Sequence, residues 1–156
     1  LDHTIVDDAS QTWGQLGSVT GDFALPDAGD QLIDLIHTPK SQFRVNGRFV
    51  MNRRTAAVVR KLKASDGSYL WAPGAGGEAA TVLGYPVTEL EDMPDIGIGN
   101  AAIAFGDFRR GYLIADRQGA RVLRDPFSAK PYVLFYTTKR VGGGVQNFDA
   151  IKAMVF

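Results

Sequence analysis

The spacing of apolar residues predicts a short helix in the first third of the chain. Leu32, Ile33 and Ile36 recur at the interval of three to four residues that marks one face of a helix. Pro26 precedes this run and suits a helix start, whereas Pro39 follows it and cannot continue a helix. The pattern therefore predicts a helix bounded by these two prolines.

A strand, a cap and a second helix are predicted in succession further along. Arg48–Met51 is a short apolar strand, and Asn52 is a favourable N-cap because its side chain can accept from a free helical N–H. Residues 55–63 then place three apolar residues on one helix face. The stretch 65–77 is rich in turn residues and is predicted to be a surface loop pinned by aromatic side chains.

Beyond Leu83 the apolar pattern becomes that of short strands separated by glycines and prolines. Two or three helices and six or seven strands, not in strict alternation, predict an α+β fold class and disfavour a doubly wound parallel sheet. The predicted strands are residues 85–90, 102–105, 112–116, 121–124, 132–139 and 151–156.

One of these strands changes character along its length. Residues 132–136 are apolar on both faces, whereas residues 137–140 are polar. A strand that is apolar on both faces is typical of a buried position. We therefore predict that this strand begins inside a core and that its polar end runs out to solvent or to a neighbouring subunit.

The opening segment, residues 1–27, is rich in glycine, aspartate, serine and threonine, with isolated apolar residues such as Trp13. This composition predicts extended or looping chain, so we expect a connecting segment here. Leu1 is not an initiator methionine, and the chain is therefore expected to be a fragment or a processed product.

Charge and composition narrow the function classes. Seventeen basic residues balance seventeen acidic ones, so no overall field attracts DNA or an anionic membrane surface. The chain has no cysteine, which excludes disulfides, thiolate zinc sites and cysteine nucleophiles. No apolar run is long enough for a membrane span and no leader pattern is present. We therefore predict that this protein does not associate with a membrane.

Catalytic and metal-binding patterns are also missing. The two histidines, His3 and His37, have no partner constellation, and no Gly-x-Ser-x-Gly pattern occurs. The acidic start around Asp7 and Asp8 lacks the spacing of a calcium loop, and the glycine clusters lack the Lys-Ser/Thr pair of a phosphate loop. We therefore predict no catalytic, metal or cofactor-binding residues and no enzyme. A small hydrolase that pairs His37 with a carboxylate is the alternative from the enzyme class.

Charged residues supply the candidate contact sites. Arg53 and Arg54 lie in the first turn of a predicted helix, where cations oppose the helix dipole. Either they meet acidic groups on an adjacent subunit or they form a solvated pair, and both interpretations stay open. Alternating charges along residues 107–125 fit networked interface charges and plain surface charges equally. The candidate subunit-interface residues are Arg53, Arg54, Asp107, Arg109, Arg117, Arg124, Lys139 and Arg140.

An ordered series of short motifs covers residues 30–156. The series resembles the major capsid proteins of tailed phages that have the fold of the Hong Kong ninety-seven phage. Its motifs resemble those of capsid proteins from both siphophages and the gene transfer agents (GTA) of α-proteobacteria. The motifs are FVMNRRT (49–55), RKLK (60–63), DG (66–67), YLW (69–71), LGYPV (83–87), DMPD (92–95), FGDF (105–108), YLIADR (112–117), LRDP (123–126), YVLFY (132–136) and RVGG (140–143).

The resemblance implies a division into parts. Residues 28–127 would form the axial domain and residues 128–156 the carboxy-terminal part of the peripheral domain, after the connecting segment 1–27. The amino-terminal arm, the extended loop and the spine helix of the family are absent from this sequence. No covalent crosslink is therefore predicted.

The resemblance also implies a structural function. The protein is expected to assemble with itself, as pentameric and hexameric capsomers, into the icosahedral head of a virion in the bacterial host cytoplasm. Double-stranded DNA would be enclosed without specific binding, and a portal, a scaffold or a maturation protease would be the family's other partners. The shell of an encapsulin-like nanocompartment is the alternative within the same fold.

Overall fold

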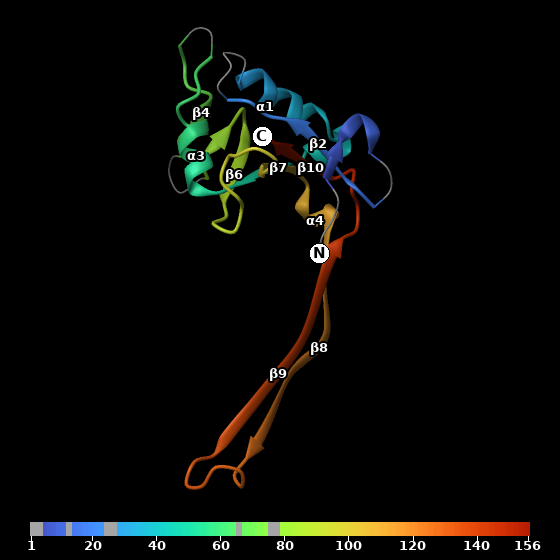
Figure 1. Ribbon diagram of the computed structural model, residues 1–156, viewed down its shortest axis with the longest axis vertical. Helices are drawn as coiled ribbons and strands as arrows, with labels where there is room; N and C mark the ends of the chain where they lie inside the picture. The colour runs from blue at the N-terminus through green and yellow to red at the C-terminus, as the bar shows by residue number, and fades with distance from the viewer. Residues whose placement is uncertain (1–4, 12–13, 24–27, 65–66, 75–78) are drawn as a thin grey trace.

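The protein is described by a computed structural model that covers residues 5–11, 14–23, 28–64, 67–74 and 79–156. A mixed eight-stranded sheet forms the body, and a long two-stranded hairpin projects from it (Figure 1). The strands of the sheet lie in the order β1 (Ile5–Asp7), β2 (Leu16–Thr20), β10 (Ile151–Val155), β7 (Ala101–Gly106), β3 (Arg48–Met51), β6 (Tyr85–Glu89), β5 (Thr81–Val82) and β4 (Trp71–Ala72).

The helices are short, and two of them lie where the sequence pattern predicts helices, although the second ends at Val59 and not at residue 63. α1 (Ala28–His37) buries Leu32 and Ile36, whereas Ile33 is exposed at its surface. α3 (Arg53–Val59) begins after Asn52, whose side chain accepts from the Thr55 N–H at 2.7 Å as an N-cap. The other helical turns are η1 (Asp8–Ser10), α2 (Ser41–Arg44) and α4 (Phe108–Gly111).

The core lies on one face of the sheet. Phe49 pairs with Phe105, and Ile103 pairs with both Met51 and Met154, so all five side chains point to the same face. Their residues are fully buried together with those of Leu32 and Leu35 in α1. Full burial of each such side chain contributes about 1.5–3 kcal/mol, so this cluster holds the body together.

The segment predicted to be a connection, residues 1–27, supplies two strands of the sheet. β1 and β2 run parallel to each other, and β2 runs parallel to β10 with Ala153 opposite Ser18. Lys152 on β10 is buried, and its Nζ lies 2.5 Å from the Asp8 carboxylate and contacts Gln11 Oε1. The segment is therefore part of the body, although Trp13 and His3 lie outside the described residues.

Other predicted boundaries differ from the structure as well. The strands predicted at 112–116 and 121–124 are one continuous strand, β8 (Tyr112–Asp125), which pairs with β9 (Leu134–Val145). Within the loop predicted at 65–77, Trp71 is buried and forms part of β4, while residues 65, 66 and 75–77 lie outside the described residues. The predicted domain boundary at residue 127 falls in the turn between β8 and β9, and β10 returns to the body.

The prediction that residues 132–136 lie in a core, with the later part of the strand running outwards, is wrong, because the strand runs from an exposed end towards the body. These residues lie at the far end of the hairpin and are exposed, with Phe135 and Tyr136 each 65% exposed. The glycine-rich end of β9, residues 142–144, is the end that joins the body. An apolar run on both faces of a strand therefore does not lie in this chain's own core.

Gly106 lies where β7 passes closest to the start of β10. Its φ is +151°, and an added Cβ would lie 2.0 Å from the Ala150 carbonyl oxygen. Neither the backbone angle nor the space tolerates a side chain, because the obstacle is backbone.

We predict that Gly106→Ala destabilises the protein by more than about 2 kcal/mol, because it adds a clash to an unfavourable φ. Gly119→Ala is the matched control, since an added Cβ there meets nothing within 4 Å. Chemical denaturation of both variants measures the difference. Equal stability of the two would contradict the close approach at Gly106.

Candidate assembly surface

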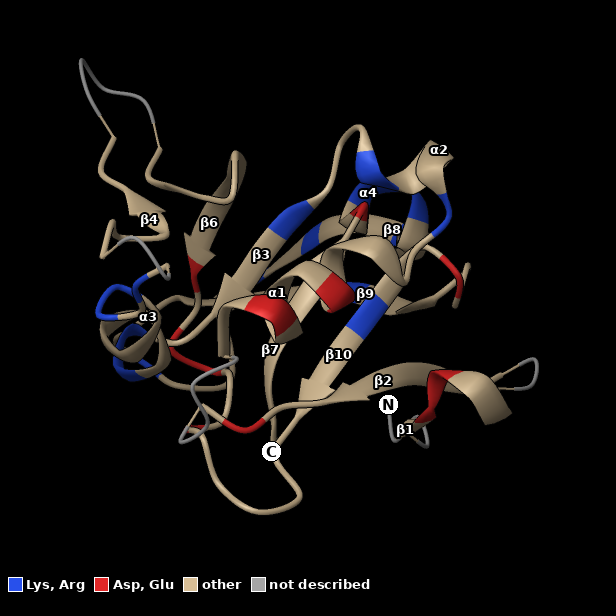
Figure 2. Ribbon diagram, turned by 90° about the horizontal axis from the view of Figure 1, so that it is seen from above, with Lys and Arg blue, Asp and Glu red and all other residues tan. Residues whose placement is uncertain are grey.

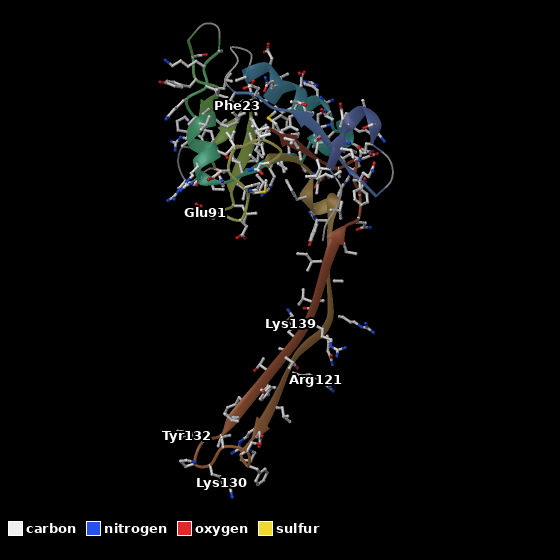
Figure 3. The ribbon with its side chains drawn as sticks, viewed as in Figure 1. Phe23, Glu91, Arg121, Lys130, Tyr132 and Lys139 are labelled. Carbon is white, nitrogen blue, oxygen red and sulfur yellow. The ribbon has the colours of Figure 1, made fainter. Side chains whose placement is uncertain are left out.

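The hairpin β8–β9, residues 112–145, is called the arm. At about 3.3 Å per residue its 14-residue strand is about 46 Å long. Of the nineteen exposed large apolar residues in the described part of the chain, twelve lie on the arm. Figure 3 shows Arg121 and Lys139 midway along it and Tyr132 near its far end. The arm thus carries most of the protein's exposed apolar surface.

An exposed ribbon of this kind is not stable by its own packing. A two-stranded hairpin without a covering layer is marginally stable in water. The far end nevertheless exposes Leu123, Phe127, Tyr132, Phe135 and Tyr136, each by more than 60%. Contiguous apolar surface of this extent marks a contact with another molecule or segment. The arm is therefore the candidate assembly surface.

The arm is attached to the body by a fixed root. The Asp107 carboxylate is buried and accepts from the Arg109 and Arg110 N–H groups at 3.1 and 3.3 Å, which caps α4. The Gly111 carbonyl accepts from the N–H groups of Gln146 and Asn147 at 2.8 and 3.2 Å. Because both strands are held where they leave the body, the root sets the direction of the arm.

Two bulges shape the middle of the arm. β8 uses fourteen residues between the pairs Tyr112–Val145 and Asp125–Leu134, whereas β9 uses twelve. The register shifts twice, between Asp116 and Gln118 and between Gln118 and Arg121, and each shift adds one residue to β8. Bulges bend a ribbon and redirect side chains, and two of them restore the original alternation of faces.

Charge is divided between the arm and the rest of the chain. The arm has six basic and two acidic residues, a formal charge of +4, whereas the other residues comprise eleven basic and fifteen acidic, a charge of −4. Acidic residues colour α1 and the end of β6 in Figure 2. The neutral chain is therefore a cationic arm on an anionic body.

Arg53 and Arg54 pair within the chain, which neither of the two open interpretations anticipated. Arg54 Nη1 lies 2.7 Å from Asp95 Oδ2, and Arg53 Nε lies 3.7 Å from Glu91. Asn52 donates to the other Asp95 oxygen at 2.6 Å. Hydrogen bonds from Arg54 and then from Asn52 hold the pKa of Asp95 below its usual value. The two arginines thus tie the loop after β6 to the start of α3.

The other candidate interface residues lie on or near the arm, and the structure does not test their role. Asp107 is buried at the root, so its carboxylate serves α4 and is not a surface charge. Lys139 pairs with Asp116 at 2.8 Å on one face of the ribbon. The remaining members are exposed: Arg109 on α4, and Arg117, Arg124 and Arg140 on the arm.

A polar hollow of about 380 Å³ lies beside the amino-terminal strand and includes Asp8, Lys40, Asp149 and Lys152 in its lining. Its charged groups are paired, Lys152 with Asp8 at 2.5 Å and Lys40 with Asp149 at 2.6 Å. The bond from Lys40 lowers the pKa of Asp149. These pairs tie together distant parts of the chain, and no acid and base are left facing each other across the hollow.

The requirements of the hydrolase alternative are not met at His37. This exposed histidine lies 2.6 Å from Arg44 Nη1 and not beside a carboxylate. Within the described ranges, no three histidine, cysteine or acidic side chains gather as a metal site. No helix among the described residues is long and apolar enough to cross a membrane.

We predict that Asp107→Ala costs about 0.5–2 kcal/mol, because the first N–H groups of α4 lose their cap. Asp107→Asn keeps an oxygen acceptor and is the matched control. Hydrogen exchange of the Gln146 and Asn147 amides reports on the root, and we expect faster exchange in the alanine variant only. Equal protection in both variants would show that the cap does not hold the root.

The lowered pKa of Asp95 predicts that part of the protein's stability is lost at acidic pH. Because its pKa is lower in the folded chain than in the unfolded one, its bonds stabilise the fold above about pH 4 and are lost as pH falls further. Asp95→Asn should lower the Tm at about pH 7, and the difference from wild type should narrow towards about pH 3. Asp92→Asn, in the same loop, is the control. A constant difference across this range would contradict the assignment.

Known proteins share the sequence pattern and the fold of this chain. The phage capsid family matches residues 5–156. Two solved structures, described as "Capsid of empty GTA particle computed with C5 symmetry" and "Capsid of native GTA particle computed with C5 symmetry", are 53% and 52% identical with a TM-score of 0.84. Each covers 98% of this chain, which spans only 54% and 53% of theirs.

A more distant structure shares the fold alone. A protein of Mycobacterium phage Patience is 12% identical over 99% of this chain and 45% of its own, with a TM-score of 0.53. No curated protein matches the chain. The matched architecture confirms the predicted α+β fold of the Hong Kong ninety-seven type.

Proposed function

The chain belongs to the phage capsid family, and on that basis we propose that it is part of the major capsid protein of a phage-like particle. Its function is structural: many copies enclose double-stranded DNA in an icosahedral head, and the protein resides in the virion. The capsid family is a family of structural proteins, which supports this proposal.

The observation that carries this proposal is the exposed arm. A chain that works alone gains nothing from a ribbon of about 46 Å whose aromatic residues face water. A subunit with several symmetric neighbours gains from it, because each neighbour covers surface that one chain leaves open. The 53% identity to a GTA capsid supports the same conclusion and favours a particle of that kind over a nanocompartment.

The arm and the body correspond to the two domains expected from the family. We infer that the body, including the returning strand β10, is the axial part, and that the arm is the peripheral part. This division replaces the boundary at residue 127, because that boundary cuts the turn of one hairpin. Pentameric and hexameric capsomers are the proposed assemblies, and a portal, a scaffold and a maturation protease are the further proposed partners.

Electron microscopy of the natural protein that carries this chain, expressed alone in a bacterial host, tests the proposal. We expect closed icosahedral particles or isolated capsomers. Monodisperse monomers over a wide range of salt and pH would contradict a shell-forming function. Analytical ultracentrifugation of the same preparation measures the fraction assembled.

A further inference from the structure

The amino-terminal edge of the sheet is held to the body by few apolar contacts. β1, η1 and β2, residues 5–20 and here called the edge unit, lie at one side of the body (Figure 2). Among the described residues of this unit only Gly17 is buried, and Val19 packs half-buried against the core. β2 pairs with β10 over three residues. Polar contacts must therefore contribute much of what fixes this unit in place.

Lys152 on β10 supplies the main polar contact. It pairs with Phe105 across the sheet and lies two residues before Met154, so its side chain starts on the apolar core face. Its side chain is only 5% exposed, and its amine reaches Asp8 Oδ1 at 2.5 Å and also Gln11 Oε1. A buried ammonium needs such acceptors because its desolvation is costly. Both acceptors that the structure describes come from the edge unit.

Gly17 leaves room for this contact. A Cβ built there would lie 2.8 Å from both Gln11 Oε1 and Lys152 Nζ, and closer still to Asp8 Oδ1. Its φ lies outside the left-handed range, so the backbone alone does not require glycine. The amine and its two acceptors thus occupy the space that a side chain at residue 17 would fill.

The same contacts reach the root of the arm. Residues 146–150, here called the return loop, connect β9 to β10. Gln11 Nε2 donates to the Phe148 carbonyl at 3.4 Å, which bonds the edge unit to this loop. The Gln146 and Asn147 N–H groups of the loop donate to the carbonyl at the root of the arm. The return loop is therefore bonded to the edge unit on one side and to the arm on the other.

A second tie to the return loop does not involve the edge unit. Lys40 Nζ lies 2.6 Å from Asp149 Oδ2, but the two side chains are 69% and 46% exposed. Exposed ion pairs of this kind contribute little to stability because water and salt screen them. The buried amine of Lys152 is therefore the stronger of the two ties around this loop.

We propose that Lys152 couples the attachment of the edge unit to the direction of the arm. While the unit is attached, the return loop is supported and the arm leaves the body in one direction. When the unit separates from β10, the return loop loosens and the arm swings relative to the body. Such coupling requires one element on which both ends act, and the return loop is that element. The inference goes beyond the proposed function and holds whether or not the protein forms a shell.

Hydrogen exchange in the natural protein that carries this chain tests the coupling. Lys152→Met removes the amine and keeps an unbranched apolar side chain on the core face. We expect the amides of β2 and those of Gln146 and Asn147 to exchange about tenfold faster or more, because hydrogen bonds to a charged group are lost. The Leu90 amide, bonded to the Met51 carbonyl at 2.9 Å elsewhere in the body, should keep its rate.

Three further variants separate the possible causes. Lys40→Met is the matched control, since it removes the exposed amine at the same hollow and should leave all these rates unchanged. Asp8→Ala removes the contact from the side of the edge unit, outside the core, and should accelerate exchange in β2 and in the return loop. Gly17→Ala should do the same without altering any charge.

Each remaining outcome overturns part of the inference. Faster exchange in β2 with unchanged rates at Gln146 and Asn147 would show that the unit separates by itself, without the arm. Equal acceleration at Leu90 would show that the whole body unfolds. Unchanged rates in the Lys152 variant, or equal acceleration in the Lys40 variant, would remove Lys152 from this role. None of these results bears on particle formation, which electron microscopy tests separately.

Discussion

A two-stranded ribbon cannot bury both of its faces, and the structure depends on that constraint. The arm exposes apolar side chains along its length, and among the described residues the body holds it at its root. Such a ribbon keeps one shape only if its base is rigid and its faces are covered from outside. The body supplies the first condition, and a segment outside the described residues or a neighbouring molecule supplies the second.

The rigid base is built from contacts between residues that are far apart in the sequence. Gly106 lets β7 approach the start of β10, and Asp107 caps α4, the helical turn just before β8. The Gly111 carbonyl accepts hydrogen bonds from the two N–H groups that follow β9. On the other side of β10, Lys152 holds the amino-terminal turn through Asp8. The last strand of the chain therefore links the arm, the core and the amino-terminal segment.

Electrostatics separates the arm from the body without giving the protein a net charge. Repulsion between many neutral copies is small, while the opposite charges of the ribbon and of the body allow attraction between copies. Within the body, acidic groups such as Asp95 and Asp149 already have partners, and their pKa values are lowered accordingly. Arg121 and Arg140 on the arm have no ion-pair partner among the described residues.

Local pattern alone determined the elements: the helix between Pro26 and Pro39, the Asn52 cap and the strands around residues 85–90 and 102–105. It also identified the α+β class, because these features depend on neighbouring residues. Only the tertiary structure decided that residues 5–20 join the sheet beside β10, that Asp107 is buried, and that residues 132–136 lie at an exposed end. An apolar pattern shows which side chains need cover, but whether the same chain or another copy provides it depends on contacts that no local pattern contains.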